Sequence, residues 1–188
     1  MSELATEHFD HAEHAEHVAH SGDSFMSLVA VSIAALAVIA ATVGSLETIE
    51  AAGAGSDKND AVLLQNKASD QWAFYQAKSL KKNLYEIAAA GNEPKAVAFL
   101  AQAKRYDTES ADIMKEAKEI EHKSEEKLHS AEHHLHRHHI LTIAVTFLHI
   151  SIAVATISIV MKGKRWPWYA AIGLAIAGVI TSASAYIG

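Results

Sequence analysis

The chain has 188 residues, 50% of them hydrophobic, and a formal net charge of -6 at pH 7. The acidic balance argues against a nucleic-acid-binding protein, and the absence of cysteine excludes disulfides, thiolate metal sites and thiol catalysis. The mean hydropathy of +0.07 is that of a soluble protein. The distribution of the apolar residues along the chain is therefore more informative than their average.

The chain begins with an acidic, histidine-rich tail, residues 1–24, which contains no lysine or arginine. A histidine stands at every third position of its middle part: His8, His11, His14, His17 and His20. Side chains three residues apart on a helix are offset by about 60° around its axis, so a row of such histidines is a weak chelate for a metal ion. Three interpretations stay open: a solvated low-complexity arm, a site for zinc, nickel or copper, and a pH-responsive patch.

Three apolar stretches follow, residues 25–46, 140–161 and 168–187, and none contains Asp, Glu, Lys or Arg. Each has close to the roughly 20 residues that a helix needs to cross a hydrocarbon core about 30 Å thick. We therefore expect three transmembrane helices in contact with the lipid bilayer. The first should be retained as an anchor, because no basic segment of a signal peptide precedes it.

The 47–139 segment separates the first two expected spans and holds 13 of the 16 basic and 16 of the 22 acidic residues. Two apolar series at heptad spacing predict two helical arms. The first series is Ala73, Ala77, Leu80, Leu84 and Ile87; the second is Ala96, Phe99, Ala103, Tyr106, Ser110, Ile113, Ala117 and Ile120. Gly91, Asn92 and Pro94 favour a turn between the arms. The segment predicts an antiparallel, coiled-coil-like helical hairpin.

The first arm has two further features. Its start is expected no earlier than Asp57, because the glycine-containing segment 53–60 predicts a hinge after a linker, residues 47–56. It also carries Trp72, Phe74 and Tyr75. Trp72 and Tyr75 stand off the first apolar series, so these aromatic residues are either a second layer of core or anchors for a partner protein.

A second histidine cluster lies near the end of the second arm. His122, His129, His133 and His136 share one helical face, and the i,i+4 spacing of His129 and His133 is that of helical zinc sites. One interpretation is a site for zinc, nickel or copper; the other is a set of solvated and interfacial side chains at the end of a membrane helix. If residues 25–46 cross the membrane, this cluster and the tail lie on opposite sides and cannot form one site within a chain.

Small and polar residues recur at heptad spacing in the three spans, which favours close helix packing within the chain or between copies. The series are Ala30, Ala34, Ala37, Ala41 and Gly44; Thr142, Thr146, His149, Ala153 and Thr156; and Ala171, Ala175, Gly178, Ser182 and Ala185. His149 is an ionisable side chain near the middle of the second span. It indicates either an interhelical hydrogen bond or a proton or ion path.

The short loop 162–167 is basic, and the positive-inside rule favours the cytoplasmic side for it. This places the N-terminus in the cytoplasm and the hairpin in the periplasm. The opposite orientation stays open, because an acidic tail without lysine or arginine is easy to translocate.

The stretch ASDQWAFYQAKSLKKNLYE, residues 68–86, resembles the most distinctive segment of a family of uncharacterised bacterial membrane proteins, a domain of unknown function. The resemblance extends from about residue 25 to the end of the chain. It implies a multi-pass protein of the bacterial inner membrane with one span, a helical hairpin and two closing spans. It implies no activity and no site residues.

These observations favour a non-enzymatic structural or accessory protein, a homo-oligomer or a subunit of a larger membrane complex, that presents its hairpin to other proteins. The alternative is a protein that binds or handles divalent transition metals through its histidine clusters. We expect no catalytic residues, no cofactor-binding loop and no small-molecule substrate, because the sequence lacks a nucleophile–base set and a phosphate loop.

Overall fold

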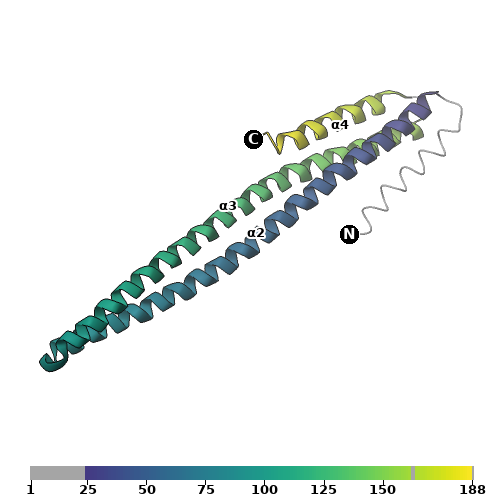
Figure 1. The fold of residues 1–188 in the computed structure, drawn as a ribbon. Helices are drawn as coiled ribbons and strands as arrows, with labels where there is room; N and C mark the ends of the chain where they lie inside the picture. Colours follow the sequence, from purple (N-terminus) through teal and green to yellow (C-terminus); the bar gives the residue numbers. More distant parts are fainter. Residues whose placement is uncertain (1–23, 162–163, 188) are drawn as a thin grey trace. The chain divides into compact units, whose positions relative to one another are not determined.

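The computed structural model describes residues 24–161 and 164–187, and every regular element in them is a helix (Figure 1). The elements are α2 (Ser24–Ala90), the 3-10 helix η1 (Glu93–Lys95), α3 (Ala96–Val160) and α4 (Trp166–Ser184). The expectation of an all-α chain is confirmed for these residues. The histidine-rich part of the tail, His8 to His20, lies outside them.

The predicted hinge at residues 53–60 is wrong, and so is the linker before it, because α2 runs without a break from Ser24 to Ala90. A glycine inside a helix costs about 1 kcal/mol relative to alanine, which tertiary contacts can outweigh. At Gly53 the reason for glycine is a close approach rather than a break. A Cβ there would lie 3.1 Å from Nδ1 and Cε1 of the His134 ring.

The predicted turn is present between α2 and α3. The Asn92 N–H donates to the Ala89 carbonyl at 3.5 Å, and the Lys95 N–H donates to the Asn92 carbonyl at 3.1 Å. The Asn92 side chain makes no capping hydrogen bond, and Pro94 lies in η1 rather than in the first turn of an α-helix. Proline suits this position because it has no N–H to satisfy there.

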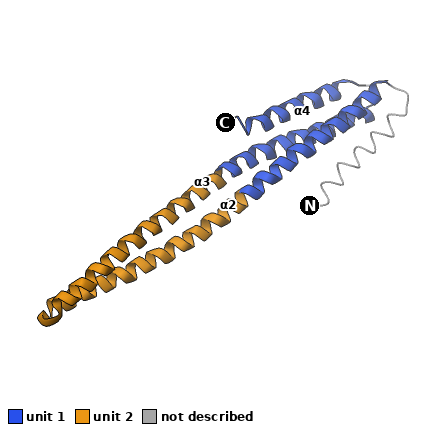
Figure 2. Cartoon of the chain, in the orientation of Figure 1, with its two compact units in different colours: residues 1–53, 133–188 blue, residues 54–132 orange. Residues whose placement is uncertain are grey.

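The chain divides into two compact units, shown in different colours in Figure 2: unit 1, residues 1–53 and 133–188, and unit 2, residues 54–132. In unit 1, segments of α2, α3 and α4 share an apolar core that includes Ile33, Leu148 and Ala171. Gly178 of α4 lies against α3, where an added Cβ would be 3.0 Å from Leu148 Cγ. The third small-residue series therefore packs within the chain, with Ala171, Ala175, Gly178 and Ala185 buried.

The outer surface of unit 1 is also apolar. Val31, Val38 and Ile180 are 67%, 68% and 64% exposed. All three α-helices contain a stretch that is long and apolar enough to cross a membrane, judged by length and composition. The second small-residue series is largely on this outer surface, because Thr142, Thr146 and Ala153 are exposed.

In unit 2, α2 and α3 lie side by side and are linked by polar contacts as well as by apolar packing. The Ser124 hydroxyl donates to the Ala61 carbonyl at 2.8 Å, and Lys127 Nζ lies 2.8 Å from Asp57 Oδ1 and 3.2 Å from Asp60 Oδ2. All eight residues of the second apolar series are buried or half-buried. The prediction for the inner face of α3 is confirmed.

The prediction for the inner face of α2 is wrong. Leu80, Leu84 and Ile87 of the first apolar series are 60%, 56% and 70% exposed. The inner face instead follows a seven-residue repeat of small side chains, with larger ones at two of its positions: Ala54, Ala61, Ala68, Tyr75, Lys82 and Ala89. Ala68 of this repeat and Ala117 of α3 are both 0% exposed, as expected where small side chains let two helices approach closely.

Candidate functional site

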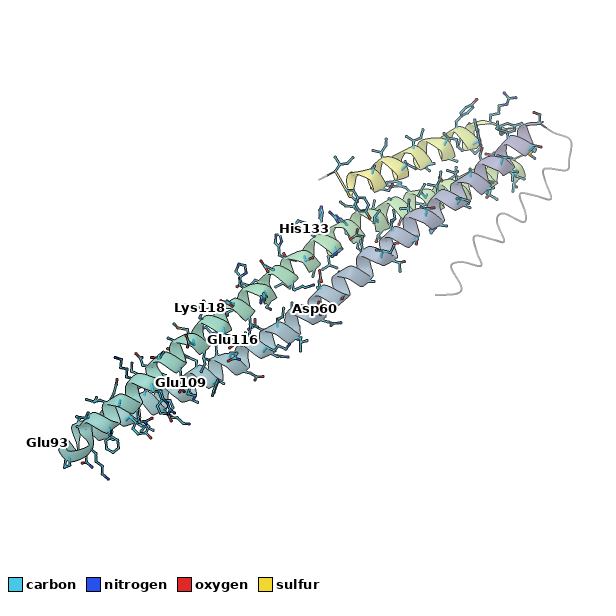
Figure 3. All side chains as sticks on the ribbon, in the orientation of Figure 1. Asp60, Glu93, Glu109, Glu116, Lys118 and His133 are labelled. Atoms are coloured by element: carbon cyan, nitrogen blue, oxygen red, sulfur yellow. The ribbon has the colours of Figure 1, made fainter. Side chains whose placement is uncertain are left out.

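All four histidines of α3 that were predicted as metal ligands are exposed: His122, His129, His133, which is labelled in Figure 3, and His136. His122 Nδ1 lies 3.5 Å from Glu126 Oε1, one turn further along the same helix. Within residues 24–161 and 164–187, no three His, Asp or Glu side chains are grouped so that they could hold a metal ion. Metal binding at this face stays a prediction.

Two other histidines of the same stretch, His134 and His138, contact α2 instead. His134 Nδ1–H donates to Glu50 Oε2 at 2.5 Å, and His138 Nδ1 lies 3.3 Å from the Glu47 carbonyl oxygen. Both pairs lie in unit 1. The signal that would have found them is the second apolar series itself. Continued beyond Ile120 by steps of four and three, it passes through Ser124, Lys127 and Ala131 to His134 and His138.

Glu50 is the centre of a polar cluster, the Glu50 cluster, formed with His134, Arg137 and Tyr186. The residue is 5% exposed. The Tyr186 hydroxyl donates to Glu50 Oε1 at 3.0 Å, and Arg137 Nη1 lies 3.9 Å from the same oxygen. The Arg137 guanidinium also lies 5.3 Å from the centre of the Tyr186 ring. The cluster therefore joins α2, α3 and the turn that follows α4.

The electrostatics of this cluster favour an ionised glutamate. Burial alone would raise the pKa of Glu50, but the hydrogen bonds from His134 and Tyr186 and the nearby positive charge of Arg137 lower it below its ordinary value of 4.5. The hydrogen bond from His134 also holds the His134 ring in one orientation, because Glu50 engages its Nδ1.

A second acidic side chain, Glu47, lies one turn before Glu50 on α2. Its Oε1 accepts a hydrogen bond from the Thr142 hydroxyl at 2.5 Å and lies 3.9 Å from His138 Nδ1. Both glutamates therefore serve as acceptors that tie α3 to α2 where the expected first span ends and the expected second span begins. Neither contact was predicted from the sequence, because residues 47–56 were expected to form a linker.

The predicted aromatic anchors divide between the inner and outer faces of unit 2. Trp72 and Tyr75 are half-buried and meet edge to face, with ring centroids 5.6 Å apart. Phe74 is 50% exposed, with Lys78 Nζ 5.2 Å from its ring centre. Tyr75 belongs to the inner repeat of α2, so of the three residues Phe74 is the one best placed to contact a partner.

Further aromatic residues pack near the turn between α2 and α3, and this packing was not predicted from the sequence. The Tyr85 ring stacks on Tyr106 with centroids 5.7 Å apart and contacts Phe99 at 5.9 Å.

In unit 1, His149 is half-buried on α3. Its assignment to an interhelical hydrogen bond or an ion path stays a prediction.

Comparison with known proteins adds a family but no activity. No curated protein and no solved structure matches the chain. A family model described as a domain of unknown function, DUF4337, matches residues 25–188. These residues include α3, α4, the Glu50 cluster and all of α2 but its first residue, and they leave out the histidine-rich part of the tail. The chain therefore belongs to the DUF4337 family.

Proposed function

We propose that this chain is a non-enzymatic, multi-pass protein of the bacterial inner membrane that self-associates through its spans and presents a helical hairpin to other proteins. Residues 25–46, 140–161 and 168–187 are the spans, and residues 47–139 form the hairpin. The observation that carries the proposal is the exposure of large apolar side chains all along unit 1, such as Val31, Val38 and Ile180. Lipid accommodates such a surface, whereas water does not.

The residues beside the short basic loop support the proposed orientation. Lys164 and Arg165 are exposed, and Trp166 and Tyr169 beside them are 63% and 60% exposed. Cations favour the cytoplasmic side of the membrane, and Trp and Tyr favour the headgroup region. The N-terminus is therefore proposed to be cytoplasmic and the hairpin periplasmic.

Self-association through the spans is supported by the residues that the chain leaves uncovered. The third small-residue series is used within the chain, but Ala34 and Ala41 of the first series are exposed on α2, seven residues apart. Small side chains let two helix backbones approach closely in lipid, where packing and hydrogen bonds drive association. A neighbouring copy would thus meet two small side chains on this face of α2.

Native mass in a mild detergent tests this proposal. We expect the wild-type chain to have a mass larger than that of one copy, and the double variant Ala34→Leu, Ala41→Leu to shift towards a single copy, because the larger side chains hold the helices apart. Ala35→Leu is the matched control, since Ala35 is also exposed on α2 but belongs to no small-residue series. A wild-type monomer, or a mass that the double variant leaves unchanged, would contradict self-association through this face.

A further inference from the structure

Within unit 2, part of α2 turns apolar side chains outward and lysines inward, the reverse of what is expected of a water-exposed helix. Its outward face carries Leu80, Leu84 and Ile87, exposed by 60%, 56% and 70%. Lys78 and Lys82 of the same two turns face α3, with side chains only 19% and 30% exposed. A helix whose outer face is solvated normally places leucine inside and lysine outside.

The inward lysines are held by ion pairs with α3. Lys78 Nζ lies 2.6 Å from Glu109 Oε2, with Glu109 labelled in Figure 3, and Lys82 Nζ lies 2.8 Å from Asp107 Oδ1. The hydrogen bond from Lys78 lowers the pKa of Glu109, and the hydrogen bond to Asp107 raises the pKa of Lys82, so Glu109 and Lys82 favour their charged forms. These contacts fix which face of α2 turns outward.

The outward apolar residues are arranged as a helix-pairing seam. Ala73, Ala77, Leu80, Leu84 and Ile87, here called the outer stripe, step by four and three residues over two heptads. That spacing is what one helix needs to receive the side chains of another. The stripe lies on the side of α2 opposite the inner repeat, so an occupant would not disturb the packing of α2 on α3.

We propose that the outer stripe is the surface on which a second copy of this chain pairs, with the two α2 helices parallel and in register. The proposal rests on the membrane anchoring proposed above, because two copies inserted in the same sense carry α2 in the same direction. In this arrangement each stripe residue meets its own counterpart. The larger side chains, Leu80, Leu84 and Ile87, then form successive layers near the turn.

The residues flanking the outer stripe are compatible with this occupant. In a parallel pair, flanking residues meet across the seam with an offset of five positions. Ser69 then lies beside the second copy's Phe74, Gln76 beside its Lys81, and Asn83 beside its Ala88, so no like charges oppose each other. The stripe stops at Asp70, the preceding position of the same spacing, where two copies would place carboxylates together.

Cysteine cross-linking tests this pairing. The chain itself contains no cysteine, so within it only an introduced cysteine can react. The full chain is made with one cysteine at a time, Ala73→Cys, Leu80→Cys or Ile87→Cys, and its native membranes are treated with a short bismaleimide. We expect all three variants to give a species of twice the chain mass. Two exposed positions on α3, Ala101→Cys and Glu116→Cys, serve as controls that should stay monomeric.

The pattern of cross-links decides the outcome. Cross-linking at Leu80→Cys alone would indicate antiparallel helices, and adducts of other masses would indicate a different protein as the partner. Either result overturns the proposal, as does a yield of cross-linked dimer no higher than that of the controls. In the Ile87→Cys background, Leu80→Gln with Leu84→Gln should lower the yield at least about tenfold, since two buried leucines are lost. Both leucines are exposed in the single chain, so these changes leave its own core intact.

The same membranes are also extracted with carbonate, which separates this proposal from the proposed function. Protein that leaves the membrane fraction would contradict membrane anchoring, and with it the reason for a parallel pair. Protein that stays in the membrane without stripe cross-links would contradict the outer-stripe pairing alone.

Discussion

Glu50 shows how a single buried charge can tie three parts of a chain together. Its carboxylate accepts hydrogen bonds from His134 on α3 and from Tyr186 after α4, while the residue itself is 5% exposed on α2. Removing one partner from a buried ion leaves it undercompensated, which usually costs more than the contact contributes. His134, Arg137 and Tyr186 together therefore contribute more to stability than any one distance indicates.

The pH dependence of stability follows from this residue. The pKa of Glu50 is lowered in the folded chain from its ordinary value of 4.5, so its stabilising effect is complete above that pH and is lost as the pH falls through the lower folded pKa. Thermal unfolding in detergent should therefore show a steeper fall in Tm below pH 4.5 for wild type than for Glu50→Gln. The exposed Glu116→Gln is the control; if Glu50→Gln and wild type gave parallel curves, the carboxylate would not be the cause.

The sequence predicts the packing of α3 better than that of α2. On α3 the inner face holds Phe99, Tyr106 and Ile113, large residues at heptad spacing, so the apolar series identifies it correctly. On α2 four of the six positions of the inner repeat are alanine, while the large residues Leu80 and Ile87 are exposed. Apolar residues at heptad spacing indicate a helix face suited to packing. They do not indicate whether the other arm or another chain packs on it.

The glycines inside α2 provide a test of the continuous helix. A Cβ at Gly55 would meet nothing within 4 Å, whereas one at Gly53 would lie 3.1 Å from the His134 ring. Gly55→Ala should raise the free energy of unfolding by about 0.5–1 kcal/mol, through helix propensity alone. Gly53→Ala should gain less or lose stability, because His134 must move from Glu50. Chemical denaturation of both variants in the same detergent gives the comparison.

Destabilisation by Gly55→Ala would contradict the helix at that point and restore the hinge that the sequence predicted. Equal gains from both substitutions would show that His134 does not rest against Gly53. The hinge prediction failed because glycine content measures only local propensity, whereas contacts such as Lys127 with Asp57 and His134 with Glu50 hold the helix on both sides of these glycines.

At the scale of the whole molecule, composition and spacing predicted the helices of the described residues and the position of the turn between α2 and α3. Both predictions rest on local signals, the length of the apolar stretches and the turn-forming residues from Gly91 to Pro94. The Glu50 cluster was out of reach. It combines residues 84 and 136 positions apart in the chain, His134 and Tyr186 with Glu50. No local pattern in the sequence brings such partners together, and the tyrosine lies in a stretch that reads as membrane span.

The histidines separate the two hypotheses for the whole chain. On α3, His129 and His133 are exposed at i,i+4 spacing, while His134 and His138 are engaged with α2. If the chain handles metal through the exposed face, EDTA-washed, untagged protein should take up zinc, nickel or copper, and His129→Ala with His133→Ala should abolish the uptake that depends on α3. His134→Ala with His138→Ala should lower stability and leave this uptake in place, because those rings face the glutamates of α2.

Deletion of residues 1–23 completes the experiment, since the tail carries its own five histidines and the family match begins at residue 25. Uptake that disappears with the tail and survives the α3 variants would assign metal binding to a feature outside the family's matched residues. Uptake that none of the three variants changes would exclude both histidine clusters as its cause. No uptake by the intact chain would contradict the metal-handling alternative as a whole.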